Sequence, residues 1–246
     1  MLGMTTTSDP GNSGVKDIAE ALGGGLKENS LVLIEGESKT GKSVLSQHVA
    51  YGVLHSRGSS VAYYSTEYNS ESLQVQMASM SMGIRQYLAT DRLRIFKMGS
   101  RDVLRDAQKS LQIILNHILQ LPERFKLVIV DSPSPFLAKL EPVVKVDFLQ
   151  ACKEICEQHN RTVILVLDTH IFESKTMMRS YAMSDYYLRL RSQDAILDAG
   201  HIDTRVIKQL QVTKLSGAER WGQKPIKFEI KPRVGINLLP FMQVKI

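Results

Sequence analysis

The sequence has few of the features that distinguish other classes of protein from ordinary globular proteins. It has only two cysteines and one tryptophan in 246 residues, and no apolar run approaches the roughly 18 residues of a membrane-spanning helix. The first residues are polar and lack an apolar signal core, which indicates a short flexible tail over residues 1–13 and a cytoplasmic protein. Apolar residues make up 43% and charged residues 23%, as in a soluble globule with a sizeable core.

The scarcity of cysteine also limits redox and metal chemistry. Cys152 and Cys156 are four residues apart on a predicted helix. This spacing supplies too few ligands for a metal site, and a disulfide at this spacing does not suit a helix. We therefore expect both thiols to pack in the core.

Acidic residues become rare toward the C-terminal end. Residues 1–200 hold 22 Lys and Arg against 22 Asp and Glu, whereas residues 201–246 hold 9 against 3, so the net charge of +6 comes from this last segment. Such an excess of basic residues can bind nucleic acid, a membrane surface, an acidic partner or the nucleotide of a neighbouring subunit. A solvated face without a partner remains the alternative.

A phosphate-binding motif, the Walker A pattern G-x-x-x-x-G-K-S, spans residues 36–43. An apolar strand is predicted over residues 31–35 and an amphipathic helix over residues 42–56, which is the context that this motif requires. A Gly/Ser turn with a chance lysine is therefore disfavoured. The predicted nucleotide-binding residues are Gly36, Ser38, Lys39, Thr40, Gly41, Lys42, Ser43 and Val44.

Each residue type in this loop has a chemical reason. Glycines let backbone N–H groups approach a polyphosphate closely, and the following helix N-terminus favours an anion. Lys42 is expected to reach the β- and γ-phosphates of ATP or ADP, and the Ser43 hydroxyl is expected to bind Mg²⁺.

Apolar strands alternate with helices along the first two thirds of the chain. This alternation predicts an α/β fold, a P-loop NTPase with a mostly parallel central sheet and helices on both faces. From about residue 185 the pattern changes to short alternating segments, which predicts a C-terminal antiparallel extension on one edge. We read residues 14–246 as a single domain. The expected strands cover 31–35, 61–64, 92–98, 127–130, 163–167, 186–191, 205–214, 226–230 and 236–244, and the other expected helices cover 15–22, 70–82, 104–118 and 143–159.

Polar residues follow three of the predicted strands, where a parallel sheet binds its ligand. Asp131 fits the Walker B acid that holds Mg²⁺ through water, with a turn or helix-cap aspartate as the alternative. Glu67 is the best candidate for the base or water-positioning group of hydrolysis, with a surface carboxylate as the alternative. Thr169 and His170 are candidate sensors of the γ-phosphate, with a structural histidine at a strand end as the alternative.

The opening D-I-A-E-A-L-G-G-G-L-K-E-N-S-L-V-L-I-E-G-E-S-K-T-G-K-S resembles KaiC/RecA-like ATPases. Together with the C-terminal I-N-L-L-P-F-M-Q-V-K-I it is similar to the accessory ATPases of the archaellum, the archaeal swimming filament. The resemblance covers residues 15–246 and implies a RecA/KaiC-like domain that binds ATP or ADP with Mg²⁺. It assigns the catalytic glutamate to Glu67 and the Walker B acid to Asp131. It also implies a hexameric ring at the membrane-proximal base of the archaellum, beside the motor ATPase FlaI and scaffold and platform proteins, with no nucleic acid.

One position departs from the family pattern. KaiC-like rings use a K-x-R pair that reaches the neighbour's γ-phosphate, and here Lys214 is followed by Ser216 where arginine is expected. Loss of an arginine finger costs several orders of magnitude in rate. We therefore expect a nucleotide-gated assembly protein with weak hydrolysis, in which Lys214 acts in trans. The alternatives are a RecA-like recombinase paralogue that binds DNA and a KaiC-like signalling autokinase.

Overall fold

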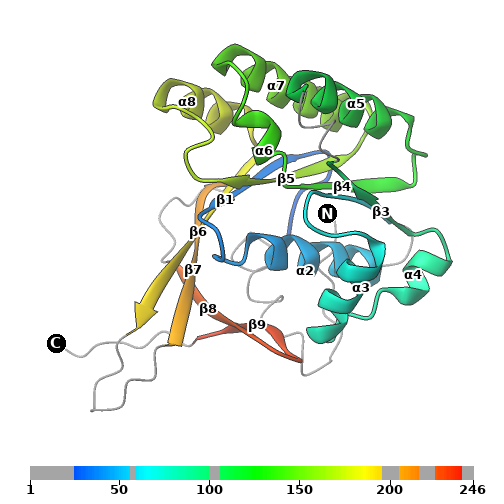
Figure 1. Cartoon of the computed structure of the whole chain (residues 1–246), viewed down its shortest axis with the longest axis vertical. Helices are drawn as coiled ribbons and strands as arrows, with labels where there is room; N and C mark the ends of the chain where they lie inside the picture. Colours follow the sequence, from blue (N-terminus) through cyan, green and yellow to red (C-terminus); the bar gives the residue numbers. More distant parts are fainter. Residues whose placement is uncertain (1–24, 56–58, 100–105, 196–204, 216–224, 240–246) are drawn as a thin grey trace.

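The fold is organised around one large β-sheet. The computed structural model describes residues 25–55, 59–99, 106–195, 205–215 and 225–239. Within them, nine strands form one sheet in the order β3-β2-β4-β5-β1-β6-β7-β8-β9 (Figure 1). Their bounds are β1 Leu31–Gly36, β2 Ser60–Ser65, β3 Leu93–Lys97, β4 Phe125–Asp131, β5 Thr162–Asp168, β6 Tyr186–Ala195, β7 Arg205–Leu215, β8 Ile226–Lys231 and β9 Gly235–Leu238.

The six strands from β3 to β6 in this order are parallel. β1, β2, β4 and β5 are buried almost throughout, as their continuous apolar runs require when helices cover both faces. In register, Gly36 of β1 pairs with Asp168 of β5, and Ser65 of β2 pairs with Asp131 of β4. The carboxyl ends of these four strands therefore meet at one edge, as predicted.

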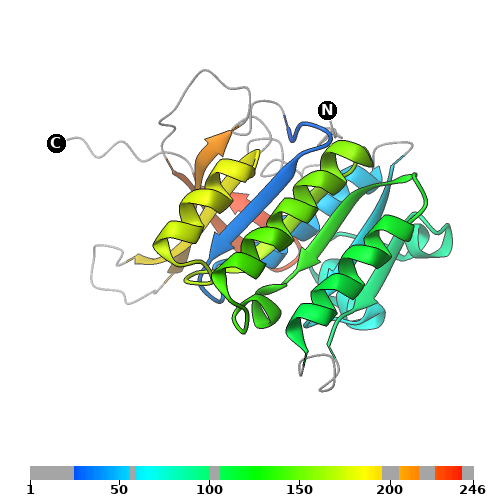
Figure 2. The same cartoon turned by 90° about the horizontal axis from the view of Figure 1, so that it is seen from above.

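Helices cover both faces of the sheet. α5 (Ala107–Gln120), α6 (Ser134–Leu137), α7 (Pro142–Gln158) and α8 (Ser174–Met183) lie on one face, and Figure 2 shows α8, α7 and α5 side by side across it. α2 (Lys42–His55), α3 (Ser70–Ser79) and α4 (Arg85–Ala89) lie on the other face. The two layers correspond to two apolar clusters on opposite faces of the sheet. The predicted mostly parallel fold with flanking helices is therefore confirmed.

The C-terminal strands form the predicted antiparallel extension, with one difference. β6, the first of the four expected short strands, pairs in parallel with β1, and only β7, β8 and β9 are antiparallel. The α8 crossover between β5 and β6 explains the direction of β6, since a helical connection returns the chain to a parallel strand. The extension curls toward α2 (Figure 1), and the backbone N–H of Ile236 donates to His48 Nε2 at 3.4 Å.

Several local expectations need correction. The predicted helix over residues 70–82 ends at Ser79, and three helices were not predicted: α4, α6 and α8. α4 and α6 are too short to show a helical period, with 5 and 4 residues. The expected tail and helix over residues 1–22 lie outside the described residues, as does the end of the strand expected over residues 236–244, of which β9 covers the first part.

Both cysteines are buried in α7 and neither forms a disulfide, so the prediction of core packing is confirmed. Burial raises the pKa of Cys152 well above its ordinary value and raises that of Cys156 to about 12. Both side chains therefore stay protonated at neutral pH and act as small apolar groups.

Candidate functional site

A cavity of about 340 Å³ opens where the parallel strands end. Residues 38–44 of the predicted P-loop line this cavity. Gly36 does not line it, but its carbonyl oxygen accepts a hydrogen bond from the Lys42 ammonium. Thr66 and Glu67 follow β2 into the same cavity, and Asp131 and Asp168 enter it from β4 and β5. The predicted P-loop residues, Glu67 and Asp131 are therefore brought together around one space.

The loop has a backbone that side chains would obstruct. Gly41 has φ +97°, and a Cβ there would meet Ile230 Cδ1 at 2.9 Å. A Cβ at Gly36 would lie 2.6 Å from the Leu190 carbonyl oxygen, because β6 passes directly beside the loop. The two motif glycines therefore allow a tight turn with backbone on one side and side chains of β8 on the other.

Lys42 is the first residue of α2 and is almost completely buried. Its ammonium donates to the carbonyl oxygens of Gly36 and Glu37, each at 2.8 Å, and lies 3.0 Å from an Asp168 carboxylate oxygen. These partners hold the charge at the inner end of the loop. Asp168, the last residue of β5, was not predicted, because only the following Thr169 and His170 were assigned to the site from the sequence.

Asp131 lies at the centre of a buried hydrogen-bond network. It accepts from the Ser43 hydroxyl at 3.1 Å and from the Tyr63 hydroxyl at 2.6 Å, and Tyr63 also contacts Ser46 at 3.1 Å. Burial raises the pKa of Tyr63, so its hydroxyl keeps the proton that it donates. Tyr63 was read only as part of an apolar strand, because nothing in the sequence shows that its hydroxyl points toward β4.

The environment of Asp131 opposes its ionisation. Its pKa is raised from 3.8 to about 6, chiefly by burial. The hydrogen bonds from Tyr63 and Ser43 and the charge of Lys42 lower the pKa, and the charge of Glu67 raises it, but burial outweighs them. The folded-state pKa is above the unfolded value. The stability contributed by this group is therefore present below about pH 4 and is lost as the pH rises through 6.

The direction of this pKa shift leads to a prediction about stability. In the absence of metal, we expect Asp131→Asn to raise the free energy of unfolding at pH 7.5 by up to about 3 kcal/mol, because a neutral amide replaces a buried carboxylate that ionises at a cost. Near pH 4.5 the difference should fall to about 1 kcal/mol, because the carboxyl is then protonated in the folded chain but still mostly ionised in the unfolded chain. Urea unfolding at both pH values measures it, with the exposed Asp147→Asn as a control. A loss of stability at pH 7.5 would contradict the prediction.

Glu67 lies in the loop after β2. Its side chain is exposed on the cavity, and its charge acts on Asp131. The Ser65 hydroxyl accepts from the backbone N–H groups of Glu67 and Tyr68, at 3.2 Å and 2.9 Å, which fixes the turn that presents the carboxylate. The geometry suits a group that acts on a water in the cavity.

Thr169 and His170 are not brought into the P-loop cavity. They line a neighbouring cavity of about 490 Å³, together with Glu35, Glu37, Arg189 and Arg191. The backbone N–H of Thr169 donates to the Gly36 carbonyl at 3.2 Å, so this loop contacts the P-loop through its backbone. The sensor role of both residues stays a prediction, and the side chain that touches Lys42 is that of their neighbour Asp168.

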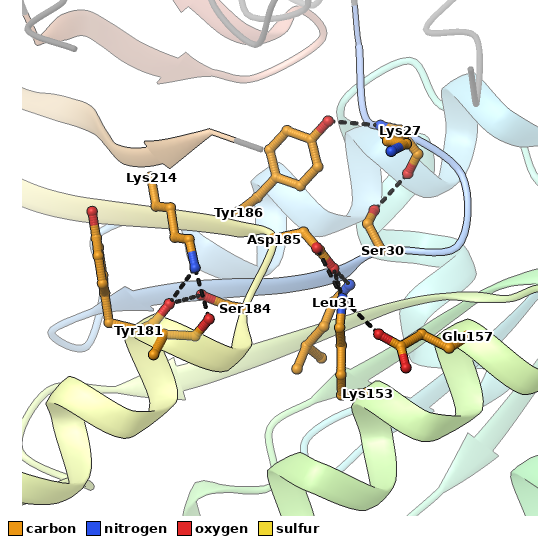
Figure 3. Close-up of polar contacts among 11 residues, drawn as sticks. Lys27, Ser30, Leu31, Lys153, Glu157, Tyr181, Ser184, Asp185, Tyr186 and Lys214 are labelled. Carbon is orange, nitrogen blue, oxygen red and sulfur yellow. Dashed lines mark hydrogen bonds and ion pairs between the residues drawn. The ribbon is translucent and has the colours of Figure 1, made fainter. Parts of the chain in front are cut away.

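Lys214 lies away from the P-loop cavity of its own chain. It pairs with Tyr187 on β6, next to the start of β1, and the P-loop follows the opposite end of β1. Its ammonium donates to the Tyr181 carbonyl at 2.7 Å and the Ala182 carbonyl at 2.9 Å, in the last turn of α8 (Figure 3). This is the expected position of a cation at a helix C-terminus. Action in trans on a neighbour's nucleotide stays a prediction.

The same corner of the sheet holds a partly buried ion pair. Asp185 accepts from Lys153 at 2.8 Å and 2.9 Å and from the backbone N–H of Leu31 at 2.8 Å (Figure 3). The contacts tie α7 to the start of β1 and β6. This polar cluster is therefore structural, because each of its polar groups has a partner within the chain.

The donors around Ser43 fit a magnesium ion that is also bound by phosphate. A hydroxyl and a carboxylate lie side by side, and oxygen is the ligand type that Mg²⁺ prefers. No group of three or more His, Cys, Asp and Glu side chains suited to a metal occurs in the described residues. Phosphate oxygens and water would therefore have to complete the coordination.

None of the helices in the described part of the chain combines the length and the hydrophobicity that a membrane crossing requires.

Comparisons with known proteins agree with this geometry. A family model described as "ATPase: KaiC" matches residues 11–242. The chain is 30% identical over 224 residues to the archaeal flagellar ATP-binding protein FlaH of Methanocaldococcus jannaschii, covering 89% of this chain and 91% of that one. A crystal structure of the flagellar accessory protein FlaH from M. jannaschii superposes with a TM-score of 0.78 at 23% identity, covering 97% and 99% of the two chains. The DNA repair and recombination protein RadB of Thermococcus gammatolerans is 38% identical over 123 residues, 49% of this chain and 50% of that one.

Proposed function

Because the chain belongs to the KaiC family of ATPases, in its FlaH branch, we propose that it binds ATP or ADP with Mg²⁺ in the P-loop cavity. The observation that carries this proposal is the shared cavity itself. It brings the glycine-containing loop, the ammonium of Lys42, the Ser43–Asp131 pair and the Glu67 carboxylate around one space. These are the groups that phosphoryl-transfer sites combine.

Each residue has a defined task in this proposal. Loop N–H groups and Lys42 bind the phosphates, and Ser43 and Asp131 hold the magnesium ion, Asp131 through water. The bound Mg²⁺ neutralises phosphate charge. Glu67 orients a water molecule and accepts its proton as the oxygen attacks the γ-phosphorus, and the bond from that phosphorus to the bridging oxygen breaks to leave ADP.

We further propose that hydrolysis by the isolated chain is weak. Ser216, which lies outside the described residues, stands where the family pattern has arginine, and Lys214 is bonded to α8 within its own chain. Without an arginine finger, the charge that develops on the phosphates is poorly compensated. We expect a turnover well below one per second for the chain alone, measured by phosphate release. Turnover in tens per second would contradict the proposal.

In this proposal, the bound nucleotide controls assembly of the protein. We propose that ATP favours a homo-oligomeric ring, with six subunits by family resemblance, at the cytoplasmic base of the archaellum beside FlaI and its scaffold and platform proteins. The name of the FlaH relative, an archaeal flagellar ATP-binding protein, supports this setting. Light scattering after size exclusion, with and without Mg-ATP, tests it. A mass that does not depend on nucleotide would contradict nucleotide-gated assembly.

DNA binding is the main competing function, and the partial similarity to RadB favours it. The cations of the basic C-terminal segment argue against it. Lys214 donates to two backbone carbonyls at the end of α8, and Lys231 lies 3.2 Å from Glu229, so these two ammonium groups already have partners within the chain. A gel shift with single-stranded DNA separates the functions, because tight binding at physiological salt would favour the recombinase.

A signalling autokinase is the other competing function. A stable phosphoryl adduct in mass spectrometry after incubation with Mg-ATP would favour it.

A further inference from the structure

The antiparallel extension brings one lysine into the P-loop cavity from a distant part of the sequence. Lys208 lies on β7, where it pairs with Ser192 of β6 and Phe228 of β8, and its side chain lines the cavity. Its stem passes close to Gly41, where an added Cβ would meet Lys208 Cδ at 3.3 Å. The absence of a side chain at Gly41 therefore leaves room for this lysine beside the loop.

The Lys208 ammonium has only a neutral partner within the described part of the chain. It donates to the backbone carbonyl of Lys39, a P-loop residue, and it has no carboxylate within ion-pair distance there. Burial lowers its pKa, because the charged form is partly removed from water. A partly desolvated ammonium with a single neutral partner gains from contact with an anion.

The position of Lys208 also distinguishes it from the other lysines of the extension. Lys214 contacts the end of α8, and Lys231 lies beside Glu229. Lys227 is exposed on β8 and pairs through its backbone with Gln209. Among the described lysines of β7 and β8, Lys208 alone lines the cavity that holds Lys42.

We propose that Lys208 is a second cation for the polyphosphate of the bound nucleotide, supplied in cis by the C-terminal extension. This inference rests on the proposed nucleotide site and adds a residue to it. Lys42 binds the phosphates from the inner end of the loop, and Lys208 binds them from its outer side. The chain thereby contributes from within the same subunit some of the positive charge that Ser216 cannot supply from a neighbour.

The test measures binding of Mg-ATP, ADP, adenosine and tripolyphosphate by calorimetry for five chains: the unaltered protein, Lys208→Ala, Lys208→Arg, Lys227→Ala and Lys42→Ala. Lys208→Ala should weaken ATP and tripolyphosphate binding about 10-fold, since a charge-assisted hydrogen bond is lost, and should leave adenosine binding unchanged. Lys208→Arg should restore most of the affinity, because it keeps the charge. Lys227→Ala is the matched control, and it removes one positive charge from the adjacent strand without touching the cavity.

Two further readouts separate this role from a structural one and from a contact between subunits. The loss should be the same at protein concentrations above and below subunit association, because the lysine acts within its own chain. The thermal unfolding temperature of Lys208→Ala without nucleotide should match that of Lys227→Ala.

Several outcomes would overturn the inference. Unchanged ATP affinity in Lys208→Ala would do so, as would an equal loss for adenosine or a loss seen only in the associated protein. If the unaltered chain binds ATP and Lys42→Ala does not, the proposed nucleotide site stands even when Lys208 proves neutral. If the unaltered chain binds neither ATP nor tripolyphosphate, the proposed function and this inference fail together.

Discussion

Lys42→Ala should weaken ATP binding by roughly 100-fold or more, the largest effect expected of any single substitution in this chain. The ammonium is held by the Gly36 and Glu37 carbonyls at the inner end of the cavity, where it is almost completely buried. A cation in this position compensates phosphate charge at low cost, because little side-chain freedom remains to be lost on binding. Alanine removes that charge and leaves the loop backbone alone to bind the anion.

Binding of a fluorescent ATP analogue measures the loss. Lys109→Ala on α5 is a suitable control, because Lys109 is an exposed lysine that does not line the cavity, and α5 lies on the opposite face of the sheet from α2. Lys42→Met is a second variant, since it keeps most of the apolar stem and separates loss of charge from loss of packing. Circular dichroism confirms that the variants fold. Unchanged affinity in both Lys42 variants would show that the nucleotide does not use this loop.

Glu67→Gln should lower the rate of ATP hydrolysis by about 10² to 10⁴ while ATP affinity is retained or slightly increased. The carboxylate lies on the cavity wall and accepts a proton only during the reaction, so its loss affects the chemical step. Removing a negative charge close to the phosphates also reduces repulsion in the bound state. The effect is measurable even when turnover is slow, provided that single-turnover conditions are used.

The control for this variant is Glu71→Gln, which removes an equivalent exposed carboxylate in the first turn of α3. It should leave both affinity and rate unchanged. An equal loss of binding and hydrolysis in Glu67→Gln would indicate that Glu67 supports the loop structurally. An unchanged rate would assign the water-positioning task to another group in the cavity.

The parallel core of the fold could be predicted from the sequence, because the signals for it lie in short, continuous segments. Each buried strand is a continuous apolar run that ends in a polar residue, and the P-loop lies between such a strand and a helix. The carboxyl-end rule for parallel sheets then placed Glu67 and Asp131 beside the loop, and the structure places both there.

The parts that sequence reasoning missed depend on contacts between distant residues. Lys208 and Lys39 are 169 positions apart, and only the pairing of β7 with β6 brings them together. Tyr63 was missed because a buried tyrosine on a strand has the same pattern as any apolar residue, although its hydroxyl donates to Asp131 on the neighbouring strand β4. The direction of β6 was missed because no helix was predicted between β5 and β6, where α8 lies.

One side of the P-loop cavity is lined by Lys208 on β7 and Ile230 on β8, which are translated long after the loop itself. A nascent copy that has not yet paired these strands lacks the Lys208 and Ile230 side chains on one side of the cavity. Because the expected contribution of Lys208 is about 10-fold in affinity, such a copy should still bind nucleotide, but more weakly than the finished chain.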